Sequence, residues 1–223
     1  MASQRNIVLV TDSFYHVYNR GVERRPVFIN RRGYQRAKQL IDYYLFSNVP
    51  VKFSRFYSLS YEKQQTILLS LTNQQKLVDL ISYCLMPNHF HFLLRQRKEK
   101  GIATFISKFT NAYTKYFNTR YDRVGPLFQG IFKAVYVETD EQLLHLSRYI
   151  HLNPVTSSLI NLQDLQGYEW SSFPVYSEEV HDKNINKQII LSIFPSIESY
   201  KRFVFDQADY AKTIHSLQHL SLE

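Results

Sequence analysis

The chain has 223 residues, of which 44% are hydrophobic and 15% aromatic, enough apolar material for a full core in one domain or in a domain with an appendage. Lysine and arginine number 27 against 19 acidic residues, and the resulting charge of +8 favours polyanionic partners, nucleic acid first and an anionic membrane surface second. The single cysteine, Cys84, excludes an intramolecular disulfide and a four-cysteine zinc site, while no apolar stretch has the length of a membrane span, so we expect a cytoplasmic protein that does not bind membranes.

The first quarter of the chain alternates between a strand pattern and a helix pattern. Residues 14–19 predict a strand that is closed by a turn at Gly21. Residues 30–46 have apolar side chains at helical spacing with basic residues between them, which predicts an amphipathic helix. Residues 49–75 are ambiguous: 51–59 alternate loosely like a strand, and 64–71 fit a short helix.

Two histidines follow in the most informative stretch of the sequence. Residues 77–85 and 89–94 predict two strands joined at Met86-Pro87-Asn88. Alternate side chains leave a strand by the same face, so His89 and His91 point one way while the phenylalanines between them pack the other way. Such a pair can hold a divalent metal with room for water and substrate. The same pattern also fits two half-exposed strand histidines, because His-x-His alone is a weak motif.

A second long helix is predicted over residues 102–118, followed by a turn at Gly125-Pro126 and a strand over 132–138. Basic side chains lie on or just beyond this helix: Lys108, Lys115, Arg120 and Arg123. Interleaved with aromatic residues, they could neutralise phosphates while rings stack on unpaired bases. The other interpretation is that the rings belong to the core and the lysines form a solvated face.

Residues 140–153 predict a helix with two different stripes. Asp140 can cap it, and Leu143, Leu146 and Ile150 form its apolar stripe. The second stripe consists of Gln142, His145, Tyr149 and Asn153, which are neighbours at spacings of three and four. We expect Pro154 to end the helix at Asn153. The chain has 17 tyrosines, so Tyr149 also fits the ordinary structural role of a tyrosine whose ring packs in the interior and whose hydroxyl is hydrogen-bonded.

Several of these segments together resemble a known family. They are His16-Val17-Tyr18-Asn19-Arg20-Gly21, Met86-Pro87-Asn88-His89-Phe90-His91, Gly125-Pro126-Leu127-Phe128-Gln129-Gly130, Arg148-Tyr149-Ile150-His151-Leu152-Asn153-Pro154-Val155 and Glu169-Trp170-Ser171-Ser172. In order and spacing they resemble the single-tyrosine HUH transposases with an IS200-like domain, most closely the branch of REP-associated tyrosine transposases. The resemblance extends over about residues 12 to 175, and ordered motifs are more specific than any one of them.

The resemblance implies roles for individual residues. His89, His91 and Asn153 would bind Mg²⁺ or Mn²⁺, and Tyr149 would be the nucleophile that forms a covalent 5′-phosphotyrosine intermediate. Tyr113 and Tyr116 are the alternative nucleophiles, because a tyrosine-rich helix also precedes the Gly-Pro turn. His145, on the predicted face of Tyr149, is a candidate proton shuttle, whereas His151 should face away.

The resemblance also implies the partner, single-stranded or hairpin DNA in a bacterial nucleoid, with the protein acting as a monomer or a homodimer. Candidate DNA contacts are Arg20, Lys108, Lys115, Arg120, Arg123, Lys133 and Arg148. One departure concerns position 131, where an arginine is expected and the chain has isoleucine. A phosphate contact there would be lost or supplied by Lys133.

The order strand, helix, strand, strand, helix, strand predicts an α+β fold of the ferredoxin-like type, an antiparallel sheet with helices on one face. We expect a nuclease domain over residues 1–176 and a C-terminal helical extension over 177–223. Because the same fold serves RNA-binding modules, a non-catalytic RNA- or DNA-binding protein is the alternative function. A metal-dependent hydrolase that uses water is a third interpretation, since it would share the histidines without needing Tyr149.

Overall fold

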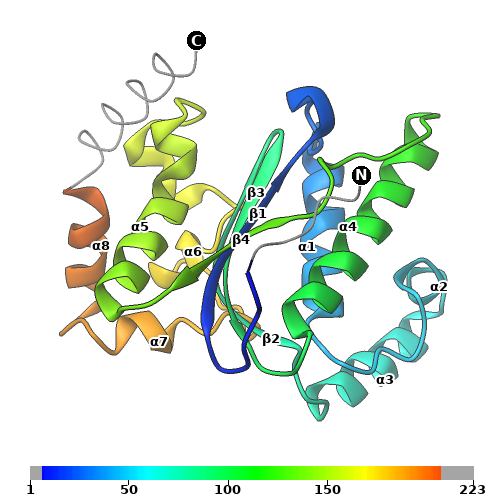
Figure 1. Cartoon of the computed structure of the whole chain (residues 1–223), viewed down its shortest axis with the longest axis horizontal. Coiled ribbons are helices and arrows are strands. Elements are labelled where there is room, and N and C mark those ends of the chain that lie inside the picture. Colours follow the sequence, from blue (N-terminus) through cyan, green and yellow to red (C-terminus); the bar gives the residue numbers. More distant parts are fainter. Residues whose placement is uncertain (1–6, 207–223) are drawn as a thin grey trace.

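A four-stranded antiparallel sheet forms the centre of the protein (Figure 1). The computed structural model describes residues 7–206. Its strands are β1 (Phe14–Arg20), β2 (Val78–Met86), β3 (His89–Gln96) and β4 (Lys133–Val137), in the spatial order β2-β3-β1-β4. With a helix between β1 and β2 and another between β3 and β4, this is the predicted α+β, ferredoxin-like arrangement.

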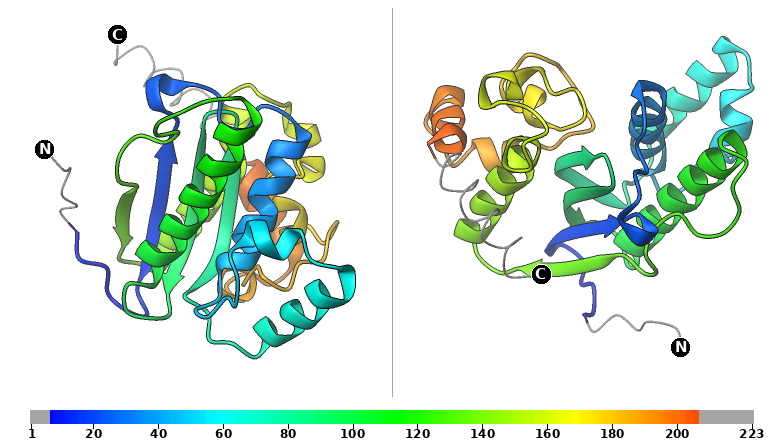
Figure 2. Two further views of the ribbon diagram at one scale, coloured as in Figure 1. Left: turned by 90° about the vertical axis from the view of Figure 1, so that its right-hand side faces the viewer. Right: turned by 90° about the horizontal axis from the view of Figure 1, so that it is seen from above.

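Both faces of the sheet carry helices. On one face lie α1 (Arg31–Tyr44) and α4 (Gly101–Arg120), where Phe90 of β3 stacks edge-on against Phe109 of α4 (Figure 2). The predicted helices on one face are therefore present. On the opposite face lies α5 (Asp140–Thr156), which leaves β4 and returns across β3 and β2 (Figure 1). This crossing brings Tyr149 of α5 over the histidine face of β3.

The ambiguous segment folds as a helical excursion. Helix α2 (Phe53–Tyr57) occupies the stretch expected to alternate like a strand, so that prediction was wrong, whereas α3 (Tyr61–Thr72) contains the predicted short helix. Phe53 and Phe56, three residues apart, are both buried against the ring of Tyr43 on α1. This spacing of three is a helical contact, and the packing of these two rings outweighs the loose alternation around them.

Both ends of α5 differ from the sequence-based prediction. Thr139, not Asp140, is the N-cap, and its hydroxyl accepts the backbone N–H of Gln142 at 3.1 Å. The helix also continues through Pro154 to Thr156. A proline in the last turn removes a single backbone hydrogen bond, and burial of Pro154 and Val155 offsets this loss.

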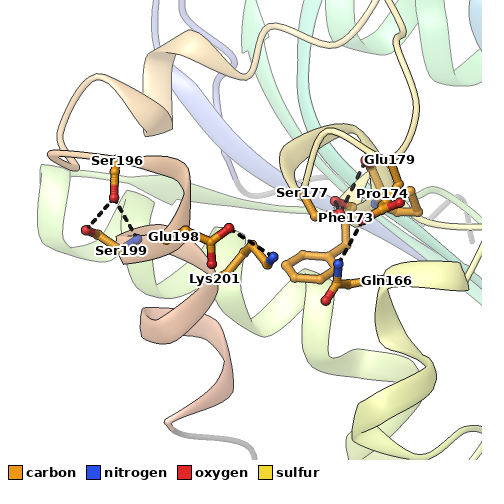
Figure 3. Close-up of polar contacts among 9 residues, drawn as sticks. All are labelled: Gln166, Phe173, Pro174, Ser177, Glu179, Ser196, Glu198, Ser199 and Lys201. Carbon is orange, nitrogen blue, oxygen red and sulfur yellow. Dashed lines mark hydrogen bonds and ion pairs between the residues drawn. The ribbon is translucent and has the colours of Figure 1, made fainter.

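The chain after α5 packs around that helix and contains short elements. They are η2 (Leu162–Gly167), α6 (Phe173–Tyr176), α7 (Gln188–Leu191) and α8 (Ile197–Phe205); a further short turn, η1 (Val22–Arg24), follows β1. Figure 3 shows Ser196 capping α8 by accepting from Ser199 N at 3.2 Å, with Lys201 and Glu198 paired one turn later. His181, after α6, is exposed, and residues 207–223 lie outside the described residues.

The outer edge of β2 is covered by the segment that follows η2. Leu85 N donates to Trp170 O at 2.8 Å, and Ser172 N donates to Tyr83 O at 2.9 Å. An edge strand with unpaired backbone groups would invite pairing with other chains, and this segment prevents that on the β2 side. Within residues 7–206 no helix has the length and hydropathy needed to cross a bilayer.

Candidate functional site

The histidine pair lies on the face of the sheet that α5 crosses. In the β1–β3 register Tyr18 is opposite His91 and Arg20 is opposite His89. Since side chains alternate along a strand, His16 and Tyr18 of β1 share this face with His89 and His91 of β3. The rings of His89 and His91 are 4.9 Å apart, and those of His16 and His91 are 5.0 Å apart. Three imidazoles therefore adjoin one another at the centre of the sheet.

Helix α5 brings Tyr149 to these imidazoles. The Tyr149 ring centroid is 5.6 Å from that of His91 and 6.0 Å from that of His16, each in an edge-on arrangement. Tyr149 keeps 46% of its surface exposed, although its neighbours on the helix, Ile150 and His151, are fully buried. A tyrosine that packs beside the buried His91 and the half-buried His16 and is still open to solvent is accessible to a substrate.

Asn153 lies one turn after Tyr149 and is buried. Its Nδ2 donates to the Tyr149 carbonyl oxygen at 3.0 Å, which anchors the amide to the helix. The Asn153 side chain also favours the ionised form of the Tyr149 phenol and acts to lower its pKa. Asn153 and Tyr149 thus interact directly, as their spacing of four predicts.

Two residues that the sequence did not single out hold the imidazoles in place. Asn88 Oδ1 is 2.6 Å from His89 Nδ1, while Asn88 Nδ2 donates to Arg24 O at 3.2 Å. His16 Nε2 is 2.8 Å from His91 Nδ1. Asn88 could have been noticed as the neighbour of His89, but His16 needs the β1–β3 register, which a single sequence does not supply.

Burial determines the ionisation of this site. It lowers the pKa of His16 to about 4, and it lowers the pKa of His91 well below its ordinary value, with nearby His16, His89 and Arg20 adding to the effect. Burial raises the pKa of the Tyr149 phenol, and the opposing influence of Asn153 and Arg20 is smaller. At neutral pH His16 and His91 are therefore neutral imidazoles and Tyr149 is a protonated phenol.

The alternative nucleophiles lie elsewhere. Tyr113 is fully buried on α4, and its hydroxyl donates to Val27 O at 2.7 Å. Tyr116, on the same helix, stacks under Arg36, and its buried hydroxyl has no hydrogen-bond partner among the described residues. Because α4 lies on the opposite face of the sheet from Tyr149, the structure does not bring either residue to the histidine pair (Figure 1).

The other two histidines of α5 do not adjoin Tyr149. His145 Nδ1 is 2.6 Å from Arg148 Nη2, and its ring packs near Phe203 of α8, so the expected common face with Tyr149 is not formed. His151 faces away as predicted. It is fully buried, with Nδ1 2.7 Å from Tyr200 Oη and Nε2 2.8 Å from Ser172 Oγ. Burial lowers the pKa of His151 to about 3.

A family model described as "Transposase IS200 like" matches residues 52–153, a range that contains His89, His91, Tyr149 and Asn153. Over this region the chain is similar to the IS200-like transposases. No curated protein matches the chain. Eleven solved chains do, among them a REP-associated tyrosine transposase bound to a REP hairpin, with 14% identity, a TM-score of 0.49 and coverage of 77% of this chain and 83% of that one. At this identity and TM-score the likeness decides neither function nor residue roles.

The donor atoms of the IS200-like region fit a divalent cation with open positions. Asn88 Oδ1 can only accept, so His89 carries its proton on Nδ1 and the ligating lone pair on Nε2. The Asn153 amide adds a hard oxygen of the kind that Mg²⁺ and Mn²⁺ prefer. No cluster of three or more His, Cys, Asp or Glu side chains suited to a metal occurs in the described part of the chain. Two imidazoles and one amide therefore form the candidate set.

The basic residues expected to contact DNA are distributed over the whole molecule. Arg20 acts electrostatically on both His91 and Tyr149, and Lys133 Nζ is 5.9 Å from the Tyr18 ring, so these two border the site. Ile131, at the position where an arginine was expected, is exposed and lies two residues before Lys133. The remaining candidates lie on α4, just after it or on α5: Lys108, Lys115, Arg120, Arg123 and Arg148.

Several of these cations already have protein partners, among them Lys108, whose Nζ donates to Ser47 O at 3.4 Å. Arg123 donates to Asn118 Oδ1 and to Pro126 O, which holds the turn after α4. Arg148 stacks on Phe203, with 4.2 Å from its guanidinium carbon to the ring centroid, and donates to the Phe203 carbonyl. A role in DNA binding remains a prediction for every residue of this set. Arg20 and Lys133 are the ones that the fold brings to the site.

Proposed function

We propose that this chain cleaves and rejoins single-stranded DNA, at hairpin-flanked sites, through a covalent bond between Tyr149 and a 5′ phosphate. The observation that carries the proposal is the juxtaposition of an exposed tyrosine with two neutral imidazoles, with 5.6 Å between the Tyr149 and His91 ring centroids in one chain. The similarity of residues 52–153 to the IS200-like transposases supports the same reaction class.

The chemistry follows from the nucleophile. The Tyr149 oxygen attacks phosphorus and the P–O3′ bond breaks, while the phenol gives up its proton and O3′ takes one up. Because the phosphotyrosine ester conserves the energy of the phosphodiester, a second 3′-hydroxyl can reverse the step without a nucleotide cofactor. Arg20 and Lys133 border the site and would attract the phosphate backbone.

In this proposal His89, His91 and Asn153 hold Mg²⁺ or Mn²⁺. The cation supplies Lewis-acid polarisation of the scissile phosphate and offsets the charge that develops on it. The raised pKa of Tyr149 explains why a tyrosine in this environment needs such help, since its phenol stays protonated at neutral pH.

A denaturing gel with oligonucleotides labelled at either end tests the proposal. The panel consists of single strands with and without hairpins, taken from the DNA on either side of the coding region, incubated with Mn²⁺. A 5′-phosphotyrosine predicts that the 3′ label moves with the protein, whereas the 5′ label appears in a shorter free strand. Tyr149→Phe should abolish both products. Tyr116→Phe is the matched control, because its hydroxyl has no partner among residues 7–206 and its loss should cost no stability.

Each rival function gives a different pattern in the same gel. A water-using hydrolase would shorten both labelled strands without a protein adduct and would tolerate Tyr149→Phe. A non-catalytic binder would retard the DNA in a native gel and leave it intact under denaturing conditions. Either pattern would overturn the tyrosine mechanism.

A further inference from the structure

The two imidazoles proposed as metal ligands have different hydrogen-bond partners at Nδ1. For His89 the partner is the side-chain oxygen of Asn88, whose orientation is set by the bond from Asn88 Nδ2 to Arg24 O. An amide oxygen only accepts, so the proton of neutral His89 is on Nδ1. For His91 the partner is the ring nitrogen Nε2 of His16, at 2.8 Å. A ring nitrogen can donate or accept, and this bond can therefore have either direction.

The direction of the His16–His91 bond decides whether His91 can bind a metal. If His91 Nδ1 donates to His16 Nε2, the lone pair of His91 is on Nε2. If His16 Nε2 donates instead, His91 carries its proton on Nε2, and that nitrogen cannot ligate. Metal-bound histidines usually donate their other ring N–H to a neighbouring acceptor, which fixes ring orientation and tautomer.

The fold holds His16 in position for this bond. It lies in β1, which is hydrogen-bonded to β3 on one side and to β4 on the other, and is opposite Leu93, two residues from His91. The planes of the His16 and His91 rings are 21° apart. The His16 ring centroid is 4.9 Å from that of Tyr18 and 6.0 Å from that of Tyr149. These contacts leave the imidazole little freedom to turn away.

We propose that His16 is a positioning residue whose Nε2 accepts a hydrogen bond from His91 Nδ1–H and so keeps His91 Nε2 as the metal-ligating nitrogen. This inference rests on the proposed function, because it assigns His16 a task toward the cation of that site. His16 lies outside the residues that match the family model, 52–153, and acts through His91 rather than on the substrate.

The first measurement needs no metal. Two-bond ¹⁵N–¹H spectra of histidine-labelled, EDTA-treated protein at pH 8 distinguish Nδ1–H from Nε2–H imidazoles. The chain has eight histidines, so the His91 signal is assigned by its loss in His91→Gln. We expect the Nδ1–H form in the wild type and a shift toward Nε2–H in His16→Phe, which keeps a ring but removes the acceptor. A wild-type His91 in the Nε2–H form overturns the inference.

The second measurement is Mn²⁺ affinity, from the electron paramagnetic resonance signal of the free ion. His16→Phe should weaken Mn²⁺ binding by about 10 to 100-fold. His16→Gln, which returns an amide acceptor near the position of Nε2, should recover most of that loss. His181→Phe, the same change at an exposed histidine, should leave the affinity unchanged. Equal affinities in wild type and a folded His16→Phe overturn the inference, and His16→Gln gives the same test if the phenylalanine variant does not fold.

The two measurements separate this inference from the proposed function. If the wild-type protein shows the Nδ1–H tautomer, loses it in His16→Phe and yet binds no Mn²⁺, the hydrogen bond is as inferred and the metal site has failed. If Mn²⁺ binds and responds to His16 while no DNA adduct forms, the tyrosine reaction has failed and the role of His16 stands.

Discussion

At the scale of single residues, Tyr149 combines exposure with a raised pKa. The side chain is open to solvent on one side and packed against His16 and His91 on the other, and burial disfavours the phenolate. Asn153 and Arg20 act in the opposite direction. The Tyr149 phenol, the proposed nucleophile, is therefore protonated at neutral pH.

The pKa of Tyr149 should lie above the ordinary tyrosine value near 10. Asn153→Ala should raise the pKa further, because it removes a hydrogen bond that stabilises the phenolate. ¹³C-tyrosine NMR titration of the metal-free protein measures both values, with Tyr149→Phe as the assignment control. Adduct formation at saturating Mn²⁺ should correspondingly speed up as pH rises from 6 to 9. An unchanged or lower pKa in Asn153→Ala would contradict the interaction.

The structure brings Tyr149, His91 and Asn153 close together, with His89 beside His91, because strand alternation and helical spacing place side chains on predictable faces; their roles remain predictions. The partners of these residues depend on long-range register. His16 becomes a neighbour of His91 only when β1 pairs with β3, and His145 leaves the tyrosine face because Arg148 and α8 hold it. Such contacts are absent from local patterns.

At the scale of elements, α5 begins one residue earlier than its pattern suggests. Thr139→Ala should lower the free energy of unfolding by about 1 kcal/mol, since the cap bond to Gln142 N is lost. Asp140→Ala should lower it less, because Asp140 interacts only with the helix dipole, and that term is screened by salt. Urea denaturation in 0.1 and 1 M NaCl compares them. An equal or larger, salt-resistant loss in Asp140→Ala would assign the cap to Asp140.

The strands and the long helices could be predicted from sequence, whereas the short helix α2 could not. Strong periodicity in α1, α4 and α5 and alternation in β1 and β3 are local properties of the chain. Residues 53–57 form a helix because Phe53 and Phe56 pack on Tyr43, a contact that the local alternation does not reveal. Likewise α5 passes Pro154 because its last turn is buried against the rest of the protein, and tertiary packing outweighs a local penalty.

At the scale of the whole molecule, two buried groups make stability depend on pH with opposite signs. Burial lowers the pKa of His151 to about 3. Below pH 6.5 this histidine is therefore protonated in the unfolded chain but not in the folded protein, and acid destabilises the fold. The pKa of Asp42 is raised to about 6 by burial and by Asp182, with Asn184, Lys38 and Lys76 opposing. Between pH 6 and 4 the folded state therefore binds the Asp42 proton more tightly, and acid stabilises it.

Substituting one of these two residues should reveal the pH dependence of stability that the other contributes. As pH falls from 6 to 4, the free energy of unfolding of Asp42→Asn should decrease by up to about 1.4 kcal/mol per pH unit more than that of the wild type. The free energy of unfolding of His151→Gln should decrease less than that of the wild type, by a similar amount. Asparagine can still accept from Asn184 Nδ2, which donates to Asp42 at 2.9 Å. Urea unfolding at pH 6, 5 and 4 gives the slopes. Parallel curves for the three proteins would contradict these assignments.

Tyr149 and the histidine pair meet within one chain, because α5 is packed on β2 and β3 of its own sheet. A mixture of Tyr149→Phe and His91→Ala should therefore form no DNA adduct beyond that of either variant alone. The gel with a 3′-labelled strand measures this, and wild type at half concentration is the control. Adduct recovery in the mixture would instead indicate that two chains share helices.

The chain beyond Ser172 contributes to the interior of the protein. Tyr200 of α8 reaches His151 and Ser147 on α5, and Ser172 joins the same imidazole to the backbone of Tyr83 in β2. A shortened protein that ends before α8 would leave His151, two residues from Tyr149, buried in the core without its Tyr200 partner. Deletions intended to trim the C-terminal segment should therefore be designed to retain Tyr200.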